Sequence, residues 1–315
     1  MRMPETLAGY IGRQSGRHQF ALAGLSTLVF LLTAVPLELQ RRIVNDAAYG
    51  GRFAPILALA IAYIVVALAE GGIKLALNIY RGWVSESAVR HLRRAALDAS
   101  SPRGSEGIEL SMVLSEVEPI GGFVGAAVSE PLLQGGILVA VFGYLVYLDS
   151  WLAALSFLVF APQIGFVPLL QAAINRRVER RVLTMREVSD GIVRDGAARS
   201  AASHAQQARI DHVFTLHMGM YQLKFTMNFL MNLTHHVGVA AALAVGGWYV
   251  VQGRIEIGTV VAFISGLGKI NDPWGDLVNW FRDMTVNRVK YRLVRDAIER
   301  MREIDLHQHG VRAAA

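Results

Sequence analysis

Long apolar segments alternate with polar segments along almost the whole chain. Six of the apolar segments approach or exceed the roughly 20 residues that a helix needs to cross a hydrocarbon core. They are Phe20 to Leu37, Phe53 to Tyr80, Ile120 to Leu148, Trp151 to Ile174, Phe225 to Val251, and Ile257 to Phe281. The pattern predicts an all-α integral membrane protein with six transmembrane helices.

The connections between these segments differ in length. Asp149-Ser150 is expected to join the third and fourth helices by a tight turn, and Gly253 marks a turn between the fifth and sixth. The polar connections at roughly 81–119 and 175–224 are long, and their apolar residues recur at helical spacing. We therefore expect the membrane helices to continue into the cytoplasm, with one break near 100–104 and another within 190–196.

The ends of the chain are shorter in apolar residues. Residues 1–18 have the spacing of an amphipathic helix on the membrane surface, residues 19–300 hold the six-helix domain, and residues 301–315 are expected to form a flexible tail. Arg13 and Arg17 precede the first apolar run, which also suits a secretory signal peptide. A membrane span is favoured because the chain stays apolar afterwards and lacks a good cleavage site.

Composition agrees with a membrane protein. Only 18% of the residues are charged and 53% are hydrophobic, whereas soluble domains have about 25% charged residues. Cysteine is absent, so disulfide and thiol chemistry are excluded.

The net charge of +6 reflects topology better than nucleic-acid binding. Most of the 31 basic residues fall beside one membrane face, and Arg41, Arg42, Arg52 and Arg254 lie on the other. This bias predicts that both termini are cytoplasmic, and we expect the protein to lie in the cytoplasmic (inner) membrane. The basic cluster at 176–181 is expected to contact membrane lipids rather than nucleic acid.

Charged residues inside the apolar segments are candidates for a substrate cavity, because each costs roughly 2.5–3.5 kcal/mol when it faces lipid. These candidates are Glu70, Lys74, Glu130, Lys269, Asp272 and Asp276. Glu70 and Lys74, spaced i,i+4, suit either a structural ion pair or a substrate contact. Glu130, just before Pro131, suits either a functional acid or a side chain that bonds to backbone within a kinked helix.

Lys269, Asp272 and Asp276 would share one face of the sixth helix. We expect this face to border a wet pathway and Pro273 to act as a helix hinge. The alternatives are that the three charges only neutralise one another, or that the helix has left the membrane by Lys269.

Two further patterns have weaker functional meaning. Gly121 and Gly125 form a G-x-x-x-G pair that allows close helix packing, either within one subunit or between two. His235 and His236 are adjacent and have no ligand at i+4, so no metal site and no catalytic residue are expected. His204, His212 and His217 suit polar packing or interface roles in the same way.

Four sequence segments together resemble the transmembrane domain of ABC exporters. They are VPLELQRRIVNDAAYGG (Val35 to Gly51), GIELSMVLSEVEPI (Gly107 to Ile120), the stretch from Gly246-Gly247-Trp248-Tyr249 through GRIEIGTVVAF to Pro273, and the basic segment NRVKYRLVRDAI (Asn287 to Ile298) that follows it. The resemblance covers roughly residues 7–300. The chain departs from the family at Met112 and Val113, where an Arg is usual, and the second inner connection keeps only a faint likeness. HMGM (His217 to Met220) is weakly similar to exporters of type I secretion systems.

The resemblance implies a permease subunit of a six-helix exporter, dimeric with an identical or a different transmembrane domain. It also implies that the tips of the inner connections couple to an ATP-binding subunit. The candidate coupling residues are Ser101, Pro102, Arg103, Arg194 and Asp195.

ATP and Mg²⁺ are expected on that partner, and not on this chain. No G-x-x-x-x-G-K-[ST] motif is present, and residues 282–315 are too few for a nucleotide-binding domain. The chain is thus predicted to be a transporter subunit rather than an enzyme. Two alternatives remain open, namely an ATPase-independent channel, sensor or regulatory subunit, and a membrane enzyme that uses the histidines with a metal.

Overall fold

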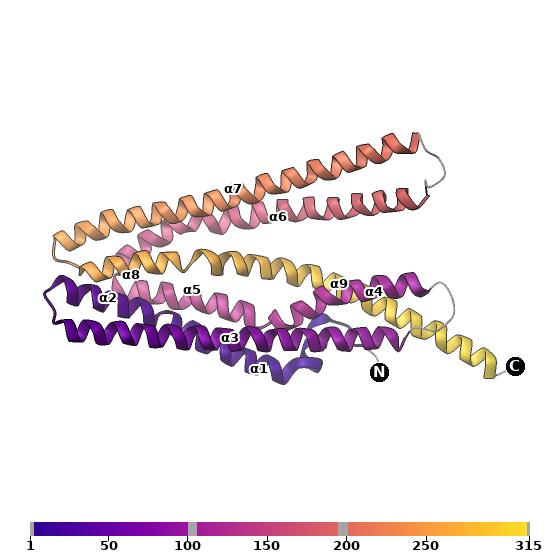
Figure 1. The fold of residues 1–315 in the computed structure, drawn as a ribbon, viewed down its shortest axis with the longest axis horizontal. Coiled ribbons are helices and arrows are strands. Elements are labelled where there is room, and N and C mark those ends of the chain that lie inside the picture. Colours follow the sequence, from indigo (N-terminus) through magenta and orange to yellow (C-terminus); the bar gives the residue numbers. More distant parts are fainter. Residues whose placement is uncertain (1–2, 100–105, 195–200, 314–315) are drawn as a thin grey trace. The chain divides into compact units, whose positions relative to one another are not determined.

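The computed structural model describes residues 3–99, 106–194 and 201–313 (Figure 1). Every regular element in those ranges is a helix, and no strand occurs there. The helices are α1 Leu7–Thr33, α2 Val35–Ala48, α3 Phe53–Leu97, α4 Glu106–Ala126, α5 Ser129–Leu148, α6 Ser150–Arg194, α7 Ala201–Val251, α8 Ile257–Gly268 and α9 Asn271–Ala313. The predicted all-α class is confirmed.

Five helical segments in the described ranges are long and apolar enough to cross a membrane: Leu7–Ala48, Phe53–Leu97, Ser129–Leu148, Ser150–Val178 and Gln207–Val251. On α3, large apolar side chains such as Ile64, Leu68 and Leu75 are exposed. Exposed apolar area is unfavourable in water and is not penalised among lipid tails. The chain is thus compatible with a helical membrane protein.

The sixth apolar segment is divided between two helices. Helix α8 ends at Gly268, and the backbone N–H of Lys269 donates to the carbonyl oxygens of Gly266 and Leu267. Helix α9 begins two residues later, at Asn271. The interruption expected at Pro273 therefore lies at Lys269 and Ile270. Pro273 falls in the first turn of α9, where its missing N–H leaves no intrahelical bond unmade.

The third apolar segment is also divided, at Ala127 and Val128 between α4 and α5. Glu130 consequently lies in the first turn of α5, and not in the middle of a kinked helix. In that turn a carboxylate is favoured by the unpaired backbone N–H groups.

The two ends of the chain differ from the sequence expectation. Helix α1 runs without interruption from Leu7 to Thr33, so no separate surface helix precedes the first apolar run. Helix α9 continues to Ala313, so the segment expected to be a flexible tail is helical almost to its end.

Several helices are much longer than a membrane crossing requires. Helices α3 and α6 have 45 residues each and α7 has 51, which correspond to about 68 Å and 76 Å, against a hydrocarbon core of about 30 Å. Helices α6 and α7 run side by side over most of their length (Figure 1). The expected continuation past the apolar segments is confirmed, although α6 passes through 190–191 without a break.

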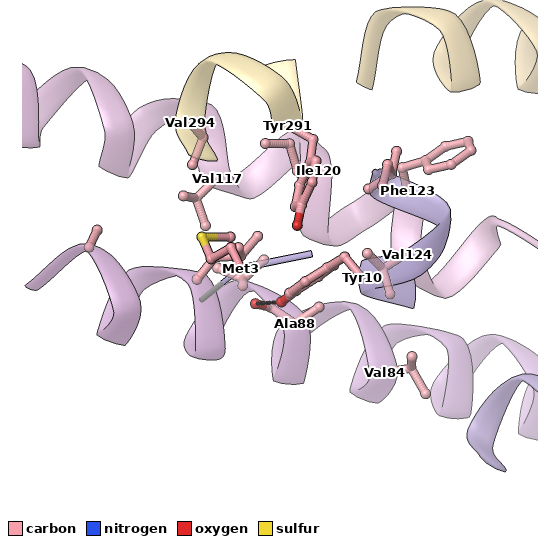
Figure 2. Close-up of a cluster of buried hydrophobic side chains, with 14 of the residues drawn as sticks. Met3, Tyr10, Val84, Ala88, Val117, Ile120, Phe123, Val124, Tyr291 and Val294 are labelled. Carbon is pink, nitrogen blue, oxygen red and sulfur yellow. Dashed lines mark hydrogen bonds between the residues drawn. The ribbon is translucent and has the colours of Figure 1, made fainter. Parts of the chain in front are cut away.

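The chain divides into two compact units. Unit 1 consists of Met1–Tyr144 and Asp272–Ala315, and unit 2 consists of Leu145–Asn271. The main core of unit 1 is formed by α1, α3, α4 and α9 (Figure 2). Tyr10 lies at its centre, where its hydroxyl donates to the carbonyl oxygen of Ala88 at 3.3 Å and its ring lies 5.3 Å from that of Tyr291.

Helices α3 and α4 pack closely because glycine lines their contact. A Cβ atom added at Gly121 would lie 2.9 Å from the backbone nitrogen of Val89 and 3.1 Å from the carbonyl oxygen of Ser85. One added at Gly125 would collide with the carbonyl oxygen of Arg81. The G-x-x-x-G pair thus packs within the subunit, as one of the two interpretations predicted.

Unit 2 is built on the α6/α7 pair and α8. Side-chain Oδ1 of Asp149 accepts from the backbone N–H of Leu152 at 2.7 Å, which caps α6 and forms the expected turn. Gly253 has φ of 69° in the turn before α8, a conformation that favours glycine. Gly246 leaves room for Val260 and Leu152, so that α6, α7 and α8 meet there.

Candidate functional site

A polar cluster joins α3, α5 and α9 inside unit 1. Nη1 of Arg81 donates to Oε2 of Glu130 in an ion pair, and the two side chains are only 17% and 18% exposed. The side-chain amide of Gln134 donates both to Oε1 of Glu130, at 2.8 Å, and to Oδ2 of Asp276, at 3.0 Å. One amide group thus connects the ion pair to a second carboxylate on another helix.

Two more charges act on this cluster. Lys74 and Asp272 lie close enough to Asp276 to interact with it electrostatically, as do Arg81 and Glu130. With every group ionised, these three carboxylates and two cations leave one negative charge in excess. Nε and Nη2 of Arg81 are buried and have no hydrogen-bond partner within the described chain, so the cluster retains unused donors.

A cavity of about 490 Å³ adjoins the cluster. Its lining comes from α4, α5 and α9 and includes Phe123, Glu130, Asp276, Trp280 and Asn287. Asn287 is only 6% exposed, and its Oδ1 has no hydrogen-bond partner among the described residues. The cavity has the size of a small-molecule site and combines aromatic walls with a few polar groups, as such sites usually do.

Helix geometry fixes the depth of the cluster along its helices. Glu130 lies 18 residues from Leu148, the far end of α5, or about 27 Å along the axis. Lys74 lies 21 residues from Phe53, the first residue of α3, or about 32 Å. Both distances are close to the thickness of a hydrocarbon core. The cluster is therefore placed where a membrane helix would reach the aqueous boundary.

The structure brings together four of the six charged residues expected to line a cavity: Lys74, Glu130, Asp272 and Asp276. Glu70 is not among the groups that act on Asp276. Its Oε1 instead accepts from Oγ1 of Thr33 at 3.2 Å, and no ion pair joins Glu70 to Lys74 within the described residues.

Lys269 lies outside the helix that carries the other two charges of its segment. It lies in the interruption between α8 and α9 and belongs to unit 2. The helix that carries Asp272 and Asp276 begins only after it, so the three charges do not share one helical face.

The candidate coupling residues cannot be placed in the same way. Ser101, Pro102, Arg103 and Asp195 lie outside the described residues. Arg194 is the last residue of α6.

Arg81 and Gln134 are the members of the cluster that sequence reasoning missed. Nothing in the sequence pairs Arg81 with Glu130, because the two residues lie 49 positions apart. Two short motifs carried a usable signal: Ser129-Glu130-Pro131 and Asn271-Asp272-Pro273 both combine a capping residue, an acid and a proline. This combination starts a helix, and both acids belong to the cluster.

Histidines form local pairs in the described chain. Nη1 of Arg181 contacts Nε2 of His217, and the rings of His235 and His236 lie 5.5 Å apart. Among the described residues, no group of three His, Asp or Glu side chains is arranged to hold a metal ion.

The chain matches no protein-family model and no curated protein.

Proposed function

We propose that this chain is the transmembrane permease subunit of an ABC-type exporter in the cytoplasmic membrane. It forms the translocation path together with a second transmembrane domain. A separate ATP-binding subunit, which carries the nucleotide and Mg²⁺, drives the transport cycle. Both termini and the tips of the α3/α4 and α6/α7 pairs face the cytoplasm.

The observation that carries the proposal is the length of the paired helices. The pairs α3/α4 and α6/α7 extend well past the apolar segments on the side that holds most of the basic residues. These extensions form stiff arms, because α7 packs antiparallel to α6 and α4 packs antiparallel to the C-terminal part of α3. Arms of this kind suit the transmission of a conformational change from a cytoplasmic ATPase to the membrane.

The polar cluster supports the same function. Charged groups at the level of a membrane boundary are costly unless they face water or other polar groups, and they commonly mark substrate pathways. The adjoining cavity of about 490 Å³ provides a space for a small molecule next to these charges. Asp276, which lines the cavity, belongs to α9, and in this proposal α9 is the helix that leaves the membrane toward the C-terminus.

Gentle purification from native membranes tests the proposal. A stoichiometric ATP-binding polypeptide should accompany the chain, and its ATP hydrolysis should respond to transported substrate only when the chain is present. Deletion of residues 100–104 should abolish this response and leave membrane insertion unchanged. Isolation of the chain without any ATPase, with ion or solute flux that needs no nucleotide, would instead identify a channel or sensor.

A further inference from the structure

A group of aromatic rings lies where the first apolar segment of unit 1 begins and the second one ends. Nδ1 of His18, just before the first segment, lies 2.6 Å from the hydroxyl oxygen of Tyr80, the last residue of the second. The rings of Tyr80 and Trp83 stack at 6.0 Å, and His18 meets Trp83 edge-on at 5.0 Å. Amphipathic rings gather where hydrocarbon meets headgroups, so this aromatic group marks one boundary of the membrane.

A cavity of about 240 Å³ lies between α1 and α3 on the polar side of this boundary. It is lined by hydrogen-bond donors, which include Gln14, His18, Ser87, Arg90 and Arg94. In the described part of the chain, no carboxylate is among the lining residues. The cavity is thus built to receive an anion.

The two arginines of the lining are available to a ligand. Arg90 and Arg94 lie one helical turn apart on α3, both are exposed, and neither forms an ion pair with a described carboxylate. Arg13 and Arg17 on α1 lie beside the lining residues Gln14 and His18 in the sequence and add positive charge near the cavity. Guanidinium groups bind phosphate through paired hydrogen bonds, so a phosphate would relieve their mutual repulsion.

The surface on the other side of the boundary is apolar. Phe20 is 82% exposed, and Leu75 and Ile79 on α3 are also exposed. A ligand that joins a phosphate to hydrocarbon chains would therefore contact both the donors and the apolar surface. A free phosphate would contact only the hydrogen-bond donors.

We propose that this cavity binds the headgroup of an anionic phospholipid. The phosphate lies between Arg90 and Arg94, the headgroup hydroxyls contact Gln14 and Ser87, and the acyl chains follow the apolar surface of α1 and α3. A bound lipid would cross-link α1 to α3 at the boundary. The proposal needs only membrane insertion and does not depend on coupling to an ATPase.

Native mass spectrometry of the purified chain with phosphatidylglycerol or phosphatidylcholine tests the site. The unmodified chain should retain one phosphatidylglycerol more tightly than phosphatidylcholine. Each arginine near an anionic lipid contributes about fivefold to affinity. Arg90→Gln together with Arg94→Gln should therefore weaken the binding of phosphatidylglycerol about twenty-five-fold and leave the binding of phosphatidylcholine unchanged. The matched control is Arg288→Gln with Arg292→Gln, an exposed pair at the same spacing on α9, which should retain the preference.

Two further experiments distinguish binding of a lipid from binding of other anions. Inorganic phosphate and glycerol 3-phosphate at millimolar concentration should fail to displace the lipid, because they lack acyl chains. A photoreactive phosphatidylglycerol should crosslink within 14–20 or 75–94 of the unmodified chain, which needs no variant to fold. Equal retention of the two lipids, full displacement by inorganic phosphate, or an unchanged preference in the Arg90 and Arg94 variant would overturn the proposal.

Discussion

The hydroxyl of Tyr291 donates a hydrogen bond to the backbone carbonyl oxygen of Pro4, at 2.8 Å, although 287 positions separate the two residues. Nη1 of Arg295 donates to the carbonyl oxygen of Glu5 at 2.7 Å one turn later. Two side chains of α9 thus hold the segment that precedes α1. This contact fixes the N-terminal segment of the chain to the same core that contains Tyr10.

Replacement of Tyr291 should loosen this attachment. Tyr291→Phe removes one hydrogen bond and leaves the carbonyl oxygen of Pro4 without its donor, which should cost about 1 kcal/mol. Limited proteolysis should cut before residue 7 faster in the variant than in the parent chain. Tyr221→Phe, at an exposed site on α7, should leave the rate unchanged, and equal rates in all three proteins would contradict the prediction.

The stabilisation that Tyr291 provides should decrease at alkaline pH. Burial raises the pKa of Tyr291 to about 12, from 10.0 for the free side chain. Because the folded state favours the neutral phenol, its contribution to stability is complete below pH 10 and decreases as the pH approaches 12. The stability difference between the parent chain and Tyr291→Phe should shrink over this interval in detergent unfolding experiments. A difference that stays constant from pH 9 to 12 would contradict the assignment.

Breaking the ion pair of the polar cluster should be costly. Arg81→Met leaves the Glu130 carboxylate buried without a cation, and Glu130→Gln leaves the Arg81 guanidinium buried without a carboxylate. Each change should therefore lower the free energy of unfolding by about 3 kcal/mol. The double variant should cost less than the sum of the two changes. Arg42→Met provides the control, since Arg42 is 60% exposed in its ion pair with Glu38 and should cost less than about 1 kcal/mol. Additive single effects in a double-mutant cycle would show that the pair is not coupled.

Close packing of α3 and α4 should make Gly121 intolerant of a side chain. Gly121→Ala forces a methyl group against the backbone of Val89, and we expect a loss of about 1–3 kcal/mol. Gly122→Ala is a matched control one position away, where an added Cβ meets nothing within 4 Å. It should be neutral or stabilising by up to about 1 kcal/mol, because alanine favours the helix. Thermal unfolding in detergent measures both, and similar midpoints would refute the packing argument.

The absence of native cysteine permits a direct test of topology. Single cysteines at Gly50 and Gly253 should react with a membrane-impermeant maleimide from outside the cell, and cysteines at Ser101 and Ser200 should react only after permeabilisation. This orientation is expected because arginine is in excess on the side that carries Ser101 and Ser200. Labelling of Ser101 in intact cells would overturn the orientation.

Helix positions were largely predictable from the sequence, because long apolar runs and isolated turn residues depend on local chemistry. Asp149-Ser150 and Gly253 illustrate this, since each lies in the turn that its residue type favours. The interruption at Val128 was not predicted because the apolar pattern continues through it. The interruption at Lys269 was not predicted because Lys269, Asp272 and Asp276 were expected to share one face of a continuous helix. The helix-start motifs at Ser129 and Asn271 are the local signals that outweigh the apolar pattern.

The candidate site was predictable only in part. A charged residue within an apolar segment needs a partner, so Glu130 and Asp276 could be selected from the sequence alone. The identity of the partner depends on which helices pack together. Arg81 reaches Glu130 because Gly125 lets α4 approach α3 closely, and Gln134 reaches Asp276 because α5 and α9 are neighbours. Such contacts follow from tertiary packing and not from spacing along the chain.

Helix α9 contains neither glycine nor proline between Asp276 and His309, so it can behave as a rigid lever. The side chain of Tyr291, held by Tyr10 and Pro4, supplies its fulcrum. Asp276 lies 15 residues from this point, or about 22 Å, and Glu299 lies 8 residues away on the other side, or about 12 Å. A displacement of about 1 Å at Glu299 is therefore amplified to about 2 Å at Asp276, enough to break the 3.0 Å bond from Gln134. A small displacement of the C-terminal half of α9 would thereby open the polar cluster.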